Sequence, residues 1–288
     1  MSVLVDRHSF ALPRSGAPGV EIFAIGDIHG RTDLLDALLD EAAREPRRAP
    51  RRALVFLGDL IDRGPDSLGA IDMAIGAGAK IGADETIALM GNHETMMRLA
   101  LDPATEREDA IDALETWAAN GGDRVIAQFA ERVEPPADLY DLLRAVRASL
   151  PARVADWLAS LRPHWRSHEI LFVHAGVNPR VDLEVFLATP WNTPLDRLDE
   201  NGHWAWVRWP FLDHAPGPEG WSGLFVVHGH TPNDAKDHAS HAEQIERFRL
   251  NLDAGSGLTG VAEMAIIRGR RAEVVAARGP TNRMLRGG

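Results

Sequence analysis

One stretch of the chain predicts the core of the fold: Leu54-Val55-Phe56-Leu57-Gly58-Asp59-Leu60-Ile61-Asp62-Arg63-Gly64. Four apolar residues run directly into Gly-Asp, which is typical of a buried strand that ends in a tight loop. Such a strand suits a parallel or mixed sheet, whose ligands bind at the carboxyl ends of the strands. Two carboxylates and an arginine so close together would cost free energy in a turn with only a structural role. They fit a loop in which a cation neutralises Asp59 and Arg63 faces a phosphate.

The same pattern follows two more predicted strands. Residues 22–25 run into Gly26-Asp27-Ile28-His29-Gly30, and residues 86–90 run into Gly91-Asn92-His93-Glu94. Each glycine leaves room for a close approach of the backbone. The oxygen and imidazole donors favour manganese, iron(II) or zinc over calcium or magnesium. Three such loops in succession predict a metal site at one edge of the sheet.

Composition limits the class of protein. The 288 residues are enough for one large domain or two small ones, and we expect a single domain over 1–288. A formal net charge of −11 argues against nucleic acid as the main partner. The chain has no cysteine, so a metal site must use His, Asp, Asn or Glu. No apolar run suggests a signal peptide or a membrane span, so a cytoplasmic location is expected.

The remaining elements are predicted from apolar periodicity and from helix breakers. A loose N-terminal arm over 1–19 precedes the first strand, and a mobile tail follows Gly279. Residues 102–166, rich in Ala, Leu, Arg and Glu, predict a helical insert without strands. Predicted helices otherwise span 31–44, 65–79 and 95–101. Later strands are predicted at 169–173, 224–227, 249–255, 261–267 and 272–276.

Several polar or glycine-rich positions have two interpretations. Trp117-Ala118-Ala119-Asn120-Gly121-Gly122 indicates a simple turn or a loop that lies over the active site. His228 is expected to be supporting or solvent-facing, Asp253 to stabilise a turn, and Glu94 to lie behind the ligands or favour a helix N-terminus. Surface or loop positions are expected for the other histidines: His8, His164, His168, His203, His214, His238 and His241.

Two further strand ends carry histidine, in His174-Ala175-Gly176 and in His228-Gly229-His230-Thr231. Together with the three earlier loops, these motifs resemble the phosphoprotein phosphatase family of calcineurin-like metallophosphoesterases. The motifs extend from residue 21 to about residue 255, so the resemblance covers most of the chain. It implies an α/β (α+β) fold with two mixed β-sheets in a sandwich, flanked by α-helices and carrying the helical insert.

The resemblance also implies a dinuclear metal centre. Asp27, His29 and Asp59 would hold the first ion, and Asp59 would bridge to the second. Two divalent ions about 3.5–4 Å apart need an anion between them, which suits a bridging carboxylate. The second ion would also take Asn92, His174 and His230. Manganese is expected for both ions, with iron or zinc as alternatives.

The catalytic roles follow from the same resemblance. Arg63 and Arg208 would bind phosphate oxygens, together with Asn92 and His93. His93 would protonate the leaving oxygen, and Asp62 would orient it and keep it protonated. The nucleophile would be a metal-bridging hydroxide that attacks phosphorus in line. The implied catalytic residues are therefore His93, Asp62 and Arg63.

The implied activity is hydrolysis of phosphate monoesters. Met90 stands where many protein phosphatases of the family carry arginine, and no C-terminal tyrosine is present, so the chain is similar to the bacterial and phage lambda-type serine/threonine phosphatases. A symmetric dinucleoside tetraphosphate hydrolase or another small-molecule phosphatase remains the alternative. A non-catalytic module is disfavoured because Asp62, Arg63 and His93 are all retained. The expected partner is a phosphoprotein or a small phosphorylated substrate. The sequence makes no prediction of the oligomeric state.

Overall fold

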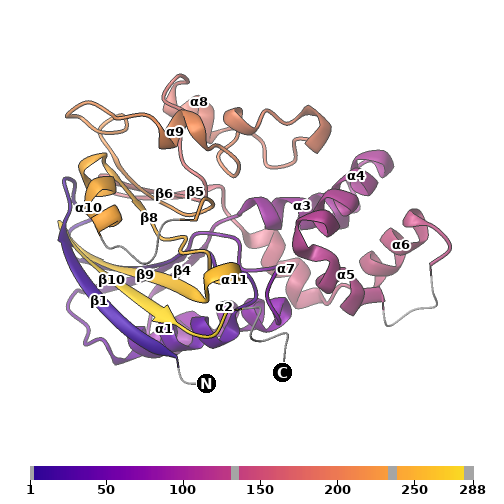
Figure 1. The fold of residues 1–288 in the computed structure, drawn as a ribbon, viewed down its shortest axis with the longest axis horizontal. Coiled ribbons are helices and arrows are strands. Elements are labelled where there is room, and N and C mark those ends of the chain that lie inside the picture. Colours follow the sequence, from indigo (N-terminus) through magenta and orange to yellow (C-terminus); the bar gives the residue numbers. More distant parts are fainter. Residues whose placement is uncertain (1–2, 131–135, 233–238, 282–288) are drawn as a thin grey trace.

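The structure, a computed structural model, describes residues 3–130, 136–232 and 239–281. Its strands form two mixed sheets (Figure 1), with the orders β1-β10-β9-β2-β3-β4 and β5-β6-β7-β8. The strands are β1 (Leu4–Ala11), β2 (Val20–Ile25), β3 (Arg51–Phe56), β4 (Glu85–Ala88), β5 (His164–Ser167), β6 (Ile170–Val173), β7 (Phe225–His228), β8 (Arg249–Asn251), β9 (Val261–Arg268) and β10 (Arg271–Arg278).

The two sheets pack face to face because their strands alternate between two apolar surfaces. Ile22 and Val55 of the first sheet share a buried cluster with Phe172 and Val227 of the second. The neighbouring residues Phe23 and Leu54, with others on the opposite face, belong to the cluster that includes helices α1 and α2. These helices cover the outer face of the six-stranded sheet (Figure 1). The predicted sandwich flanked by helices is confirmed.

The predicted helices begin and end close to the expected residues. Helix α1 keeps its five buried positions on one face, as the periodicity predicts. Helix α3 begins at Asn92, three residues before the predicted start, because Glu94 accepts a hydrogen bond from the Gly91 amide at 3.0 Å. The helices are α1 (Thr32–Arg44), α2 (Ser67–Ile81), α3 (Asn92–Leu101), α4 (Arg107–Trp117), α5 (Asp123–Ala130), α6 (Leu139–Ser149), α7 (Ala152–Ser160), α8 (Leu183–Leu187), α9 (Trp209–Leu212), α10 (Ala239–Glu246) and α11 (Ser256–Thr259).

The predicted helical insert is built from α4, α5, α6 and α7, which lie beside the sandwich (Figure 1). A kinked segment, Ala118–Gly122, in which Gly121 has a positive φ of 105°, joins α4 to α5. The prediction that residues 102–166 contain no strand is wrong at the end of this range, because β5 begins at His164. The sequence His-Trp-Arg-Ser shows no apolar alternation, and the strand forms by antiparallel pairing with buried β6.

The prediction of a loose N-terminal arm is also wrong. β1 pairs with β10 over all eight of its residues, from Leu4 opposite Arg278 to Ala11 opposite Arg271. The strand is largely exposed, and its apolar residues form two adjacent pairs, Leu4-Val5 and Phe10-Ala11, so it lacks the alternation that would mark it in the sequence. Arg7 forms ion pairs with Glu41, Glu45 and Glu273. The predicted mobile tail after Gly279 falls mainly on residues 282–288, outside the described residues.

The sheet topology places the polar loops together. Strands β2, β3 and β4 run parallel, and so do β6, β7 and β8. The carboxyl ends of parallel strands lie at one edge of a sheet, where their loops form the ligand site. Among the described residues, no helix has the length and apolar character that crossing a membrane requires.

Candidate metal centre and active site

The strand ends bring the predicted site residues into two adjacent groups. Side-chain donor atoms of Asp59, His174 and His230 lie within 4.8 Å of one another, and so do those of His29, Asp59 and His93. Asp59 therefore belongs to both groups. All five side chains are buried, with at most 5% of each exposed. A buried cluster of imidazoles around a carboxylate is a donor set that could hold a divalent cation.

Asn92 completes the group formed by His174 and His230. Its Oδ1 lies 3.2 Å from His174 Nε2 and 2.9 Å from His230 Nδ1. Its position at the start of α3 places the amide between the two late histidines. The structure thus brings together four residues that were predicted to share one ion: Asp59, Asn92, His174 and His230.

The predicted first ion has a less compact set of donors. His29 Nε2 lies 3.7 Å from Asp59 Oδ2 and 2.9 Å from Arg63 Nη1. Asp27 accepts hydrogen bonds from the His230 amide at 3.1 and 3.3 Å. Among the described residues, Asp27 is in neither group of donors within 4.8 Å. His93 takes that place, so the structure leaves His93 as a competing candidate ligand.

Backbone carbonyls orient two of the imidazoles. His29 Nδ1 donates to the Ile61 carbonyl at 2.8 Å, and His174 Nδ1 donates to the Leu57 carbonyl at 2.9 Å. These bonds leave the Nε2 lone pairs facing Asp59. Burial lowers the pKa of His29 to about 3 and also lowers that of His174. A neutral imidazole is the form that binds a metal ion.

Two observations test whether the residues fit a cation. The buried Nε2 atom of His230, a proposed ligand, has no hydrogen-bond partner. Burial, and next the neighbouring carboxylate of Asp253, raise the pKa of Asp27. Unpaired buried nitrogens and crowded carboxylates are unfavourable unless a positive charge enters the site. The donor set therefore fits divalent metal binding.

His93 is joined to Asp62 on the side away from Asp59. His93 Nδ1 donates to Asp62 Oδ2 at 2.7 Å, while Nε2 lies 3.9 Å from Asp59 Oδ2. Burial alone would lower the pKa of His93, but Asp59 and the bond to Asp62 outweigh it and raise that pKa. A protonated imidazole whose Nε2 faces the metal groups can donate a proton there.

Glu94 holds the loop after β3 against the start of α3. Its carboxylate accepts the amides of Asp59 and Leu60, both at 2.8 Å, besides that of Gly91. The expectation that Glu94 lies behind the ligands is confirmed. These bonds determine where Asp59, the residue common to both donor groups, stands.

The loops carry unusual backbone strain. Eight non-glycine residues have positive φ in the described chain, and five of them are predicted site residues: His29, Asp59, Asp62, Arg63 and His230. Such conformations cost about 1–3 kcal/mol each and concentrate at functional sites. The strain is an independent observation that marks these loops as functional.

Arg208 and Arg63 are the two predicted phosphate-binding arginines. Both are half-buried, and Arg208 stands at the N-terminal cap of α9. Arg208 helps to lower the pKa values of His174 and His230, for which burial is the larger cause. Its positive charge disfavours protonation of these two histidines.

Some residues differ from the sequence-based expectation in their burial, their pKa or their contacts. His203 lies in a loop, as expected, but is buried, whereas His241 is buried within α10, where a surface or loop position was expected. His228 is fully buried, and burial lowers its pKa to about 3. Asp253 accepts the Gly255 amide at 2.8 Å, as expected of a turn, but burial raises its pKa to about 7. The interpretation of Trp117–Gly122 as a simple turn is too limited, because Trp117 Nε1 donates to Asp62.

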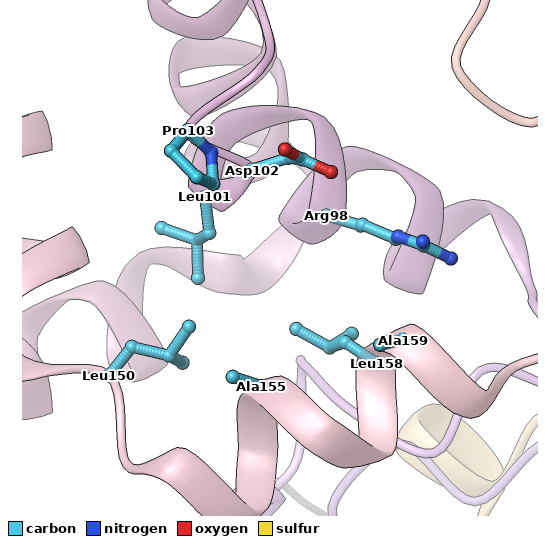
Figure 2. Close-up of a pocket in the computed structure, with 8 residues that line it drawn as sticks. All are labelled: Arg98, Leu101, Asp102, Pro103, Leu150, Ala155, Leu158 and Ala159. Carbon is cyan, nitrogen blue, oxygen red and sulfur yellow. The ribbon is translucent and has the colours of Figure 1, made fainter.

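A pocket of about 150 Å³ lies where α3 ends. Figure 2 shows Leu101 pointing across this pocket toward Leu150 and Leu158, with Arg98 and Asp102 to one side. None of the predicted site residues lines it. It is separate from the candidate metal centre.

Two curated proteins with phosphatase names are similar to part of this chain. Serine/threonine-protein phosphatase 1 of Salmonella typhimurium is 36% identical over 116 residues, which are 39% of this chain and 45% of that protein. The symmetrical bis(5'-nucleosyl)-tetraphosphatase of an Acidovorax species is 30% identical over 167 residues, 58% of this chain and 48% of that protein. The matches thus span about half the length of these curated relatives.

A solved structure and a family model complete the comparison. The cold-active protein-tyrosine phosphatase of a psychrophilic Shewanella species has a TM-score of 0.51 and 15% identity, covering 88% of this chain and 80% of that one. At this identity the likeness concerns the fold alone. The model of the calcineurin-like phosphoesterase family matches residues 20–259, which include every predicted site residue. The chain therefore belongs to the calcineurin-like phosphoesterase family.

Proposed function

We propose that this protein is a metal-dependent phosphoesterase that removes phosphate from serine and threonine side chains of proteins. One observation carries the proposal: the buried His93–Asp62 pair lies against two carboxylate–imidazole groups that share Asp59. Hydrolysis of a phosphate monoester needs positive charge near the phosphoryl oxygens and a proton for the leaving oxygen. This arrangement offers positions for both requirements within one site.

Two divalent cations, manganese by preference, would occupy the groups around Asp59. One ion would be held by Asp27, His29 and Asp59, and the other by Asp59, Asn92, His174 and His230. When bound, the cations would polarise the phosphate and lower the pKa of a coordinated water. Three imidazoles in the donor set favour manganese, iron or zinc over magnesium. Metal binding at His29 Nε2 requires Arg63 Nη1 to release this nitrogen.

His93 would act as the general acid. Its Nδ1 is occupied by Asp62, so only Nε2 can deliver a proton, and Nε2 has no other partner. Asp62 keeps the ring oriented and favours its protonated form. After the proton has moved to the leaving oxygen, the same Nε2 can be reprotonated from water as the product departs.

Arg63 and Arg208 would clamp the phosphoryl group from two sides. A guanidinium binds phosphate oxygens through parallel N–H bonds and stays charged at any working pH. Arg63 stands beside His29, and the electrostatic influence of Arg208 reaches His174 and His230. The two arginines thus serve opposite ends of the donor cluster. With Asn92 and His93 they form the proposed phosphate-binding set.

Hydrolysis of symmetric dinucleoside tetraphosphates is the second candidate activity. Relatives with this name match a larger share of the chain than the relative named as a serine/threonine phosphatase does. Both activities need metal ions, phosphate-binding arginines and attack on phosphorus. They differ in the leaving group, because a serine alkoxide needs a proton far more than a nucleotide phosphate does. The protonated His93–Asp62 pair therefore favours the phosphoprotein substrate.

A direct competition tests the proposal. The protein is dialysed against chelator, reloaded with manganese or magnesium, and assayed on a phosphoserine peptide and on diadenosine tetraphosphate. We expect manganese to restore activity better than magnesium and the peptide to have the higher kcat/KM. A preference for diadenosine tetraphosphate would establish the second activity instead. Full turnover in excess chelator after long dialysis would contradict the metal requirement, with Asp59→Asn as the inactive control.

A further inference from the structure

The helical insert contacts the proposed catalytic loop through the segment Trp117–Gly122. Trp117 is fully buried at the end of α4, and its indole Nε1–H donates to both carboxylate oxygens of Asp62, at 3.0 and 2.8 Å. The Gly121 carbonyl accepts the amide of Arg63 at 3.0 Å. Two consecutive residues of the loop are thus held by a segment that lies more than fifty positions later in the chain.

The loop needs such support because its backbone is strained. Asp62 and Arg63 have φ of 72° and 63°, so two successive non-glycine residues adopt the left-handed conformation. Strained residues persist only where their surroundings hold them in place. Within the loop, the Asp62 amide donates to Ser67 Oγ at 2.8 Å. The other restraints on these two residues include the bonds from the insert.

The two glycines of the segment allow the close approach. Gly121 has φ of 105°, and a Cβ there would lie 2.8 Å from Arg63 Cγ. A Cβ at Gly122 would overlap the indole Nε1 of Trp117, the atom that donates to Asp62. Glycine at both positions is therefore explained by packing against Arg63 and Trp117.

Asp62 Oδ2 receives two donors, His93 Nδ1 at 2.7 Å and Trp117 Nε1 at 2.8 Å. The torsion that turns a carboxylate about its Cβ–Cγ bond has a broad energy minimum, so the side chain does not determine this orientation by itself. The indole N–H reaches both oxygens and therefore determines the plane of the carboxylate. That plane sets the direction of the hydrogen bond to His93, and hence the direction in which Nε2 points.

We propose that Trp117 is a positioning residue for phosphate ester hydrolysis, which orients the Asp62 carboxylate so that His93 presents Nε2 to the leaving oxygen. This inference rests on the proposed function, because it requires His93 to be the proton donor. It assigns the helical insert a part in catalysis through one indole nitrogen. The hydrogen bonds of the Trp117 indole go to Asp62, which is not one of the proposed metal ligands.

Trp117→Phe tests the inference, because phenylalanine keeps most of the buried bulk and lacks the N–H. Loss of a hydrogen bond to a charged group should lower kcat on a phosphoserine peptide by roughly 10- to 100-fold. The loss on p-nitrophenyl phosphate should be visibly smaller, since its leaving phenolate needs less protonation. Manganese content and Tm are measured on the same samples. Equal losses on the two substrates would refute the positioning role.

The matched control is Trp221→Phe. It removes a buried indole N–H bond to the Arg247 carbonyl, 3.1 Å long, which does not involve the proposed site residues. This control should leave the ratio of the two activities at the wild-type value. Gly122→Ala supplies a second variant that displaces the indole without replacing it. Should Trp117→Phe fail to fold, the same loss of peptide activity is expected from Gly122→Ala, and an unchanged activity ratio in that variant would refute the inference.

A double-mutant cycle with His93→Asn separates this inference from the proposed function. If Trp117 acts through His93, the double variant should have a kcat within about twofold of that of His93→Asn alone. Losses that multiply would overturn the positioning role and leave the role of His93 intact. If His93→Asn alone slows both substrates equally, the proposed acid is wrong, and the inference about Trp117 falls with it.

Discussion

Replacement of His93 by asparagine separates its role as an acid from its possible role as a ligand. The asparagine amide nitrogen can occupy the position of the imidazole Nδ1 and keep a bond to Asp62, which is 2.7 Å long in the structure. The proton-bearing Nε2 has no counterpart in asparagine. The change therefore removes the proposed proton donor while the Asp62–Trp117 contact behind it can persist.

The expected loss follows from the geometry around Nε2. This atom is buried without a hydrogen-bond partner and lies 3.9 Å from Asp59 Oδ2, so its removal breaks no hydrogen bond of the structure. The loss of general acid catalysis is typically ~10²–10⁴-fold. That range corresponds to about 3–5 kcal/mol of transition-state stabilisation on a serine phosphate. On p-nitrophenyl phosphate the loss should be at least tenfold smaller, as a rough expectation.

Metal analysis and rates on both substrates test this prediction. The wild-type protein and His93→Asn are loaded with manganese, desalted and analysed for metal by atomic absorption. We expect equal metal content and a rate loss that depends on the leaving group. Loss of one ion from His93→Asn would show that His93 is a ligand, as its distance to His29 and Asp59 permits. Equal rate losses on both esters would refute the role of His93 as the acid.

Three further changes probe the ligands, the phosphate clamp and the pH dependence of folding. Asp59→Asn removes the charge shared by both donor groups, so metal content measured by atomic absorption should fall together with activity; full occupancy would contradict the bridging role. Gly121→Ala should raise KM for both esters about tenfold, because its Cβ would press on Arg63, and an unchanged KM in steady-state kinetics would argue against this contact. Burial lowers the pKa of His203 to about 4, below its unfolded value, so the unfolded state binds more protons and stability falls as pH drops from about 6.5 toward 4. In urea titrations between pH 6.5 and pH 4.5, the free energy of unfolding of His203→Gln should fall by roughly 2 kcal/mol less than that of the wild type. Equal decreases in the two proteins would refute the lowered pKa of His203.

The strands and the site loops could be predicted because their signals are local. An apolar run followed by Gly-Asp or Gly-Asn occurs within a few residues, and the structure confirms strands before each of these motifs. Helix α1 was predicted for the same reason, since its buried face repeats every three or four residues. Residue type alone also indicated which side chains could bind a cation. These predictions needed no knowledge of distant partners.

Other features depended on partners far away in the chain. Strand β1 is largely exposed and lacks apolar alternation, and it exists through pairing with β10, about 270 residues later. β5 likewise forms by pairing with β6. His241 was expected at a surface or loop position, yet it lies in α10 and is buried. Hydrogen bonds to a partner strand and burial by a neighbouring element leave no periodic trace in a short window of sequence.

The sequence by itself determined the chemistry that the site can perform, because carboxylate, amide, imidazole and guanidinium groups are properties of individual residues. Only the tertiary structure decided which of these groups meet. It joined Asp59 to both donor groups, grouped His93 with His29 and Asp59, and brought Trp117 of the insert onto Asp62. The physical reason is that a hydrogen bond or a shared cation depends on separations of a few ångströms, and these are set by the packing of both sheets and the insert around the strand ends.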